Sequence, residues 1–301
     1  MRFVVIGAGM AGILAAIRLR EAGYDDLVVY EKADRPGGTW RENTYPGLAC
    51  DVPSHFYSYS FAPNPEWTRR FSPGAEIQAY FTDVARRYGV TERTRFGQEI
   101  VRCAFADGRW HLETKDGTND TADVVIAATG VLHHPKLPDF EGLDTFAGAA
   151  FHSARWDHSV PIEGRRVGVV GTGSSAVQIV ATITERVGEL VLFQRTPQWI
   201  APTPNPAYTE EERAHFRAHP DAIAAGLHWG AYHTSGQVCA ALKRLYVPEQ
   251  LHDQVVAKLV DRAKRTKVGN GMEPDVELGP INNDMQFQKV LGLVEDAKKS
   301  G

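Results

Sequence analysis

Gly7-Ala8-Gly9-Met10-Ala11-Gly12 is the stretch that decides the fold of this chain. It follows the apolar, strand-like run Phe3 to Ile6 and leads into the helix-like run Ile13 to Ala22. A strand, a tight glycine turn and a helix in this order predict a βαβ unit whose glycines let the backbone come close to a diphosphate. Free N–H groups at the start of the helix offer the positive end of its dipole to such an anion. One motif of this length is weak evidence for a dinucleotide site, because an ordinary tight connection between a strand and a helix also matches it.

A second glycine turn, Gly171-Thr172-Gly173-Ser174-Ser175-Ala176, has the same setting, between the runs Val167 to Val170 and Val177 to Val187. The two turns are followed at the same offset by residues of opposite charge, Glu31 and Arg195. A carboxylate at this position accepts hydrogen bonds from a ribose diol, which suits FAD or NAD, whereas an arginine suits the 2′-phosphate of NADP. The pair predicts two dinucleotide sites, and the matched spacing argues against an accidental match of both turns.

The composition excludes several classes of function. With 33 basic and 37 acidic residues the net charge is -4, so we expect no nucleic-acid partner. No apolar stretch approaches the roughly 20 residues of a membrane span, so we expect no membrane partner. The length of 301 residues suggests about two domains.

The cysteines and histidines indicate neither a disulfide framework nor a metal site. Cys50, Cys103 and Cys239 are widely spaced and odd in number, which is typical of a protein in a reducing compartment. We therefore expect a cytoplasmic protein. The eleven histidines lack metal-site spacing with cysteine or carboxylate partners, so we expect no bound metal.

Loop residues between the two turns are further candidates for a site. The run Arg35 to Trp40 contains Gly37 and Gly38, which permit close backbone approach to a ligand. The run Tyr45 to Ser54 is irregular, and a loop this long in a compact domain is usually functional. Periodicity elsewhere predicts regular elements: a helix over 76–88 and strands over 99–104, 110–114 and 123–128.

A linker over residues 134–161 carries the spacing Phe-x-Gly-x3-His-x3-Trp-Asp, at Phe146, Gly148, His152, Trp156 and Asp157. As structure alone, these residues form a packed connection between domains. Their spacing resembles the fingerprint of the class B flavoprotein monooxygenases, in particular the Baeyer–Villiger monooxygenases. The resemblance covers residues 1 to about 220 and includes further segments: Gly37-Gly38-Thr39-Trp40, Tyr45-Pro46-Gly47 with Asp51, Tyr57-Ser58-Tyr59-Ser60-Phe61, Ala128-Thr129-Gly130 and Phe193-Gln194-Arg195-Thr196-Pro197.

The resemblance implies two cofactors and an oxygen-inserting reaction. It places FAD against Gly7, Gly9, Gly12, Glu31, Gly38, Thr39, Trp40, Asp51, Tyr57 and the backbone of Ile100. It places NADPH against Thr172, Gly173, Ser174, Ser175, Gln178, Arg195 and Thr196. In this family NADPH reduces the flavin, which then activates dioxygen to convert a small carbonyl substrate to an ester or lactone. Asp51 matches the family's active-site aspartate, which orients an arginine near the flavin; taken without the family, it is a loop-capping aspartate.

From about Asp221 onward the chain resembles a different family, the aldehyde dehydrogenases. The matching segments are Trp229-Gly230-Ala231-Tyr232, Ser235-Gly236-Gln237-Val238-Cys239, Lys243-Arg244-Leu245-Tyr246-Val247, Lys267-Val268-Gly269 and Glu277-Leu278-Gly279-Pro280. By this resemblance Cys239 is the nucleophile, but the family's glutamate base and asparagine donor lie upstream, in segments that this chain replaces. Two interpretations of Cys239 therefore stay open, a catalytic thiol and a packed, idle one.

Together these patterns predict an α/β fold in four parts. They are a Rossmann-like FAD-binding domain over 1–135, a fingerprint linker over 136–164, part of a Rossmann-like NADP-binding domain over 165–220, and a helix-rich, aldehyde dehydrogenase-like α/β fragment over 221–301. Because strands that close both parent sheets are missing here, we expect exposed apolar surface and impaired turnover. The expected function is an FAD-dependent, NADPH-using monooxygenase. The alternatives are an aldehyde dehydrogenase acting through Cys239 and a non-catalytic nucleotide-binding remnant; the sequence specifies neither the substrate nor the oligomeric state.

Overall fold

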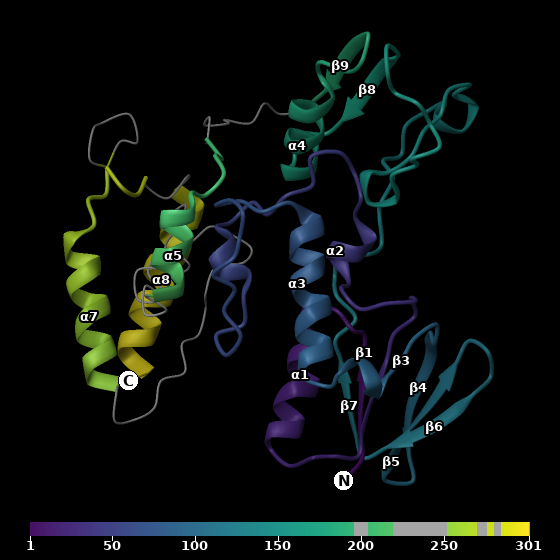
Figure 1. Ribbon diagram of the computed structural model, residues 1–301, viewed down its shortest axis with the longest axis vertical. Coiled ribbons are helices and arrows are strands. Elements are labelled where there is room, and N and C mark those ends of the chain that lie inside the picture. The colour runs from purple at the N-terminus through teal and green to yellow at the C-terminus, as the bar shows by residue number, and fades with distance from the viewer. Residues whose placement is uncertain (196–203, 219–251, 270–275, 280–283, 301) are drawn as a thin grey trace. The chain divides into compact units, whose positions relative to one another are not determined.

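The computed structural model describes residues 1–195, 204–218, 252–269, 276–279 and 284–300 (Figure 1). These residues belong to two compact units, Met1–Tyr208 and Thr209–Gly301. The first unit has the α/β fold expected from the sequence, and it contains both glycine turns.

A four-stranded parallel sheet forms the centre of the first unit. In spatial order its strands are β3 (Thr94–Arg95), β2 (Leu27–Tyr30), β1 (Phe3–Ile6) and β7 (Val124–Ala127). The short apolar run of β1 forms a central strand because it pairs on both edges, with Phe3 opposite Leu27 and Val124. Two helices pack beside this sheet, α1 (Met10–Glu21) and α3 (Gly74–Arg87) (Figure 1).

An antiparallel ribbon covers the other side of the sheet (Figure 1). Its strands are β4 (Ile100–Ala106), β5 (Arg109–Thr114) and β6 (Asn119–Ala122). Val4, Val28 and Tyr30 of the parallel sheet form a buried cluster with Leu112 and Ala122 of the ribbon. Successive side chains of a strand point to opposite faces, so the buried residues next to Val4 and Val28 point toward the helices. Burial on both faces holds the carboxyl end of β1, and the glycine turn after it, in place.

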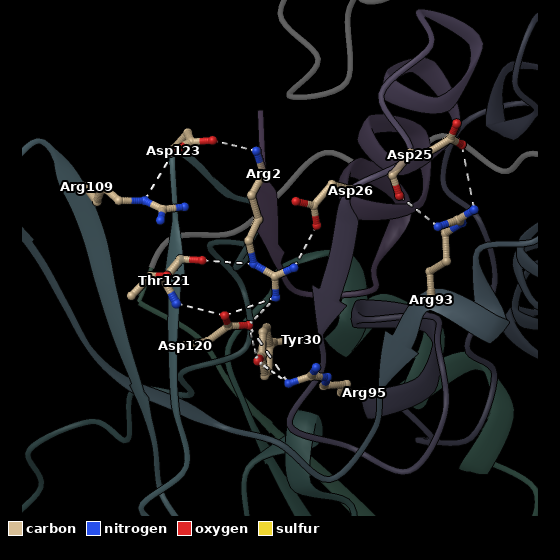
Figure 2. A network of polar contacts seen from close by, with 10 residues as sticks. All are labelled: Arg2, Asp25, Asp26, Tyr30, Arg93, Arg95, Arg109, Asp120, Thr121 and Asp123. Atoms are coloured by element: carbon tan, nitrogen blue, oxygen red, sulfur yellow. Dashed lines mark hydrogen bonds and ion pairs between the residues drawn. The ribbon is translucent and has the colours of Figure 1, made fainter.

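Figure 2 shows a polar network that fastens the ribbon to the start of β1. The Arg2 guanidinium donates two hydrogen bonds to the Asp120 carboxylate, at 2.7 and 3.0 Å, and one to Asp26 at 2.7 Å. The Tyr30 hydroxyl donates to Asp120 at 2.7 Å, and Arg95 donates to the Tyr30 hydroxyl at 2.6 Å. Burial alone would raise the pKa of Asp120, but the hydrogen bonds from Arg2 and Tyr30 outweigh burial and hold that pKa below its ordinary value. The network therefore depends on an ionised Asp120.

The second glycine turn joins a smaller parallel pair of strands. These are β8 (Arg166–Val170) and β9 (Glu189–Phe193), and helix α4 (Ser174–Ile183) connects them. The helix starts directly after Gly173, so it lies closer to the turn than the predicted run 177–187.

The two faces of the β8–β9 pair differ in how far their side chains are buried. On one face Tyr45 and Ile162 are buried together with Ile179 and Ile183 of α4. Two apolar residues of the strands are largely exposed, Val170 at 56% and Phe193 at 55%. Apolar surface of these two strands is thus exposed in the described part of the chain, and its expected origin in missing strands stays a prediction.

The remaining elements of the first unit are short. They are α2 (Thr39–Glu42) and the 3-10 turns η1 (Ser54–Tyr57), η2 (Thr91–Arg93), η3 (Leu143–Thr145) and η4 (Ser153–Arg155). Among the longer elements, the predicted helix over 76–88 and the predicted strands over 99–104, 110–114 and 123–128 are confirmed to within two residues at each end.

In the second unit, taken by itself, the regular elements that the structure describes are helices. They are α5 (Glu210–Ala218), α7 (His252–Arg265) and α8 (Asp284–Ser300). Helix α5 begins with a capping box, in which Thr209 N–H donates to Glu212 at 2.7 Å and Glu212 N–H donates to the Thr209 hydroxyl at 3.2 Å. No described helix of either unit is long and apolar enough to cross a membrane.

Candidate functional site

The first glycine turn is closed by contacts that leave little room for side chains. Gly7 has a φ of +103°, and a methyl group there would lie 2.5 Å from the carbonyl oxygen of Ala128. A methyl group at Gly12 would lie 1.8 Å from the carbonyl oxygen of Gly7. The fold itself therefore requires both glycines. Gly9 differs, because a methyl group there would stand in ordinary contact, 3.5 Å from the Cα of Gly38. Glycine at position 9 thus needs a reason other than the fold, such as a closely approaching ligand.

The structure brings the first turn, Glu31 and the Gly37–Gly38 loop together, as the sequence predicts. The N–H of Gly37 donates to the Ala8 carbonyl at 2.9 Å, and the N–H of Ala8 donates to Glu31 Oε2 at 2.8 Å. Helix α1 starts after Gly9, which has no side chain to cap it. The first N–H groups of α1 have no acceptor within the helix, so they can bind an anion at this turn.

The buried Glu31 carboxylate has three hydrogen-bond donors among the described residues. Besides Ala8, the N–H of Ala33 and the Nη1 of Arg41 donate to its Oε1, both at 3.0 Å. The side chains of Glu31 and Arg41 are only 5% and 7% exposed. A carboxylate has about four acceptor positions, so about one is left for a ribose hydroxyl. Arg41 was not predicted as a site residue, because its only signal in the sequence is a basic residue directly after Trp40.

Aromatic residues of α2 and of the segment after Asp51 contact one another and this turn. The Trp40 and Tyr57 rings meet edge to face, with centroids 5.3 Å apart. The Tyr59 hydroxyl donates to the Met10 carbonyl at 2.6 Å, and burial raises the pKa of Tyr59 well above its ordinary value. The sequence indicated Tyr59 only as part of a motif. Its support of the turn is a finding of the structure.

Two further predicted FAD contacts lie at the edges of the same region. Thr39 is exposed at the first position of α2. Ile100 opens β4, two residues after Gln98, whose N–H donates to the Glu31 carbonyl at 2.9 Å. The backbone of Ile100 is therefore close in the chain to the predicted ribose position, and the contacts of both residues with FAD stay predictions.

Asp51 is exposed and follows a buried cysteine. Cys50 is 2% exposed, and its N–H donates to the Ser72 carbonyl at 2.9 Å. Burial raises the pKa of the Cys50 thiol to about 12, so the thiol is protonated at neutral pH. Cys103 is exposed on β4. The catalytic role of Asp51 stays a prediction.

The second turn is more open than the first. Gly171 has a φ of +109°, which favours glycine, but a methyl group at Gly171 or at Gly173 would meet no atom of the described residues within 4 Å. Thr172 stands in the turn, and Ser174 and Ser175 form the start of α4. Arg195 is exposed two residues after the end of β9. Thr196, the last predicted NADPH contact, lies outside the described residues.

Gln178 of α4 contacts the loop before Asp51. Its Oε1 accepts the Tyr45 hydroxyl at 2.9 Å, and its Nε2 donates to the Ala49 carbonyl at 3.0 Å. The Ser175 hydroxyl donates to the Tyr45 oxygen at 3.2 Å. The Gln178 carboxamide thus has protein partners in Tyr45 and Ala49. Its contact with NADPH stays a prediction.

The fingerprint residues have structural contacts in the linker. Trp156 packs at the edge of the buried cluster around Tyr45. His152 Nδ1 accepts the N–H two residues ahead at 3.1 Å, and the Asp157 carboxylate accepts the N–H and the hydroxyl two residues ahead at 2.9 and 2.6 Å. Phe146 is 61% exposed, and Gly148 is exposed as well. For Trp156, His152 and Asp157 the contacts are those of a packed connection between domains.

Cys239 lies outside the described residues, together with much of the aldehyde dehydrogenase-like segment. Two described pieces of that segment, around Val268 and Leu278, form a parallel bridge, and Arg262 pairs with Glu277. Within the described ranges, histidine, cysteine, aspartate and glutamate form no group of three or more that could hold a metal.

Comparison with protein families divides the chain near residue 215. The pyridine nucleotide-disulphide oxidoreductase family matches residues 4–215, and the aldehyde dehydrogenase family matches residues 216–301. The domain boundaries given above from the sequence stay predictions.

Curated relatives of this chain include several monooxygenases. An uncharacterised monooxygenase of Mycobacterium tuberculosis is 49% identical over 274 residues, which are 91% of this chain and 55% of the relative. A Baeyer-Villiger monooxygenase of Streptomyces coelicolor is 53% identical over 234 residues, 76% of this chain and 45% of the relative. The chain thus spans about half the length of the curated relatives it matches. Since the first alignment covers 91% of the chain, it extends past residue 215, into the segment that the aldehyde dehydrogenase family also matches.

Solved structures agree with these relatives. Cyclohexanone monooxygenase from Rhodococcus sp. Phi1 bound to NADP+ matches with a TM-score of 0.70 and 32% identity, covering 84% of this chain and 49% of that one. OTEMO in complex with FAD and NADP matches with a TM-score of 0.70 and 33% identity, covering 76% of this chain and 45% of that one. The chain resembles Baeyer–Villiger monooxygenases, as the sequence predicts, and over residues 4–215 it belongs to the pyridine nucleotide-disulphide oxidoreductase family.

Proposed function

We propose that this chain belongs to a flavin-dependent monooxygenase that uses NADPH and dioxygen to insert one oxygen atom into a small carbonyl compound. The observation that carries the proposal is the first glycine turn. There Gly9 lies between the start of α1 and Gly38, and the buried Glu31 carboxylate accepts the N–H of Ala8. Because a methyl group at position 9 would fit sterically, packing alone does not require glycine there. This arrangement suits the diphosphate and ribose of FAD.

The residues of both turns fit the two cofactors by their chemistry. N–H groups at the start of α1 would hold the FAD diphosphate, and Glu31 would accept a ribose hydroxyl at its remaining acceptor position. Ser174 and Ser175 at the start of α4 would face the diphosphate of NADPH, and the exposed Arg195 would pair with its 2′-phosphate. The related OTEMO structure contains FAD and NADP together, which supports this assignment.

The proposed reaction balances with NADPH as the reductant. A ketone, dioxygen, NADPH and a proton give an ester or lactone, water and NADP+. One oxygen atom enters the bond between the carbonyl carbon and its neighbour, and the other leaves as water. FAD, when bound, supplies the two-electron transfer from NADPH to dioxygen. The relative described as cyclohexanone-bound supports a small ketone as the substrate class.

The test is NADPH oxidation by the purified chain loaded with FAD. The proposal predicts that an added ketone increases oxidation and that mass spectrometry detects the matching ester or lactone. A chain that retains flavin but shows no ketone-dependent turnover would instead support the non-catalytic nucleotide-binding remnant.

The cysteine content also leads us to expect this activity in the cytoplasm.

A second candidate is aldehyde oxidation through Cys239, because the aldehyde dehydrogenase family matches residues 216–301. This candidate predicts NAD-dependent oxidation of an aldehyde that Cys239→Ala abolishes and Cys103→Ala leaves intact. No aldehyde oxidation by the wild-type chain would remove it.

A further inference from the structure

The loop before Asp51 is seated on helix α4. Tyr45 is 7% exposed and packs in a buried cluster with Ile179 and Ile183 of the helix. Gly47 has a φ of +80°, and a methyl group there would lie 2.1 Å from the Thr182 hydroxyl oxygen. Residues 45–49, which we term the α4-docked loop, therefore approach the helix as closely as glycine permits.

The Gln178 carboxamide holds this loop through the backbone of Ala49. Its Nε2 donates to the Ala49 carbonyl at 3.0 Å, and its Oε1 lies 3.4 Å from the Ala49 nitrogen and accepts the Tyr45 hydroxyl at 2.9 Å. One carboxamide thus uses both its donor and its acceptor on a single loop. Asp51 stands two residues after Ala49, so the position of Ala49 limits where Asp51 can lie.

We infer that Gln178 and Tyr45 are positioning residues that hold the Asp51 loop on α4, and that Tyr45 couples this latch to a dinucleotide at the second turn. The coupling rests on the function proposed above. The Ser175 hydroxyl has one proton, which it donates to Tyr45 at 3.2 Å. A phosphate that takes this proton removes one contact of the latch. By linkage, a change in the latch must alter the affinity for that phosphate equally.

Cys50 offers a direct measurement of the latch, because it lies between Ala49 and Asp51 and is buried. The intact chain is treated with iodoacetamide, and peptide mapping gives the labelling rate of Cys50 relative to the exposed Cys103. Gln178→Met keeps the side-chain length and removes the hydrogen bonds. We expect it to raise the Cys50 to Cys103 ratio roughly tenfold, since two or more hydrogen bonds are lost.

The matched control is Gln98→Met, which removes an exposed carboxamide that donates to Asp116. It should leave the ratio unchanged. An unchanged ratio in folded Gln178→Met would overturn the latch. If Gln178→Met does not fold, Tyr45→Phe decides the same point, because it keeps the bond to Ala49 and removes one hydroxyl. It should raise the ratio by a smaller factor, and no increase would count against the latch.

Calorimetric titration with NADP+ tests the coupling and gives an effect that simple loosening of the structure would not produce. In Tyr45→Phe the Ser175 hydroxyl is released from Tyr45, so NADP+ should bind more tightly, by up to roughly fivefold, the worth of about one hydrogen bond. Equal or weaker binding would overturn the coupling. If the wild-type chain binds no NADP+, the proposed second site and the coupling both fail, whereas the Cys50 ratio still decides the latch.

Discussion

The hydroxyl of Tyr59 donates a hydrogen bond of 2.6 Å to the carbonyl oxygen of Met10, the first residue of helix α1. The bond joins two segments 49 residues apart in the sequence. It supports the start of the helix, while the Gly7 and Gly12 contacts close the turn from within. The position of the predicted phosphate site thus depends on a buried tyrosine outside the glycine motif.

Replacement of Tyr59 by Phe should measure this support. Phe keeps the buried ring and removes one hydrogen bond, so the free energy of unfolding should fall by about 1 kcal/mol in urea titrations. Tyr24→Phe is the control, since the Tyr24 side chain is 39% exposed. Equal stability of the two variants would show that the hydroxyl contributes nothing at Met10.

Alanine at Gly9 and at Gly12 should have different effects. At Gly12 the methyl group would stand 1.8 Å from a backbone oxygen, so Gly12→Ala should reduce folding severely. At Gly9 the nearest atom of the described residues would be 3.5 Å away, so Gly9→Ala should fold with near wild-type stability and lose affinity for FAD. Circular dichroism gives the folding and flavin fluorescence quenching gives the affinity. Unchanged FAD affinity in Gly9→Ala would contradict the binding of the FAD diphosphate at this turn.

The approach of Gly47 to α4 predicts a stability difference between two glycine substitutions. Gly47 and Gly23 have similar φ values, +80° and +85°, so alanine strains the backbone at both by roughly 1–2 kcal/mol. Of these two methyl groups, only the one at Gly47 would meet other described residues, the Thr182 side chain and the Gln178 carbonyl. Gly47→Ala should therefore lower the urea midpoint more than Gly23→Ala. Equal midpoints would contradict the close packing of the α4-docked loop.

Stability should fall at alkaline pH through Tyr30. Burial, and then the hydrogen bond to Asp120, raise the pKa of Tyr30 to about 12, above about 10 in the unfolded chain. A raised pKa means that the neutral hydroxyl stabilises the fold. That contribution is complete below about pH 10 and is lost as the pH rises through about 12. Urea midpoints measured against pH should fall less steeply for Tyr30→Phe than for the wild-type chain, and equal slopes would exclude Tyr30 as the cause.

The local parts of the fold could be predicted from the sequence. A strand, a glycine turn and a helix are contiguous in the chain, so Phe3 to Ala22 and the second turn are specified by neighbouring residues. Glu31 could be placed beside the first turn because a parallel strand ends there. For helix α4 the apolar run 177–187 gave the element but not its start, because the polar residues Ser174 and Ser175 lie outside that run.

The tertiary partners of the site could not be predicted. Tyr45 and Gln178 are 133 residues apart, and nothing in either segment's periodicity specifies the contact between them. Arg41 reaches the Glu31 carboxylate because α2 turns its side chain back into the buried region, whereas the sequence shows only an arginine in a polar stretch. Trp156 shows the converse. The fingerprint spacing indicated a family, and the structure shows a side chain packed at the edge of a buried cluster.

The central claim is that the first glycine turn binds FAD, and the flavin content of the purified chain tests it most directly. The account predicts a yellow protein, or a colourless one that takes up an equimolar amount of added FAD and quenches its fluorescence. Circular dichroism must show that the material is folded. A folded chain that is colourless and binds no added FAD would contradict the account.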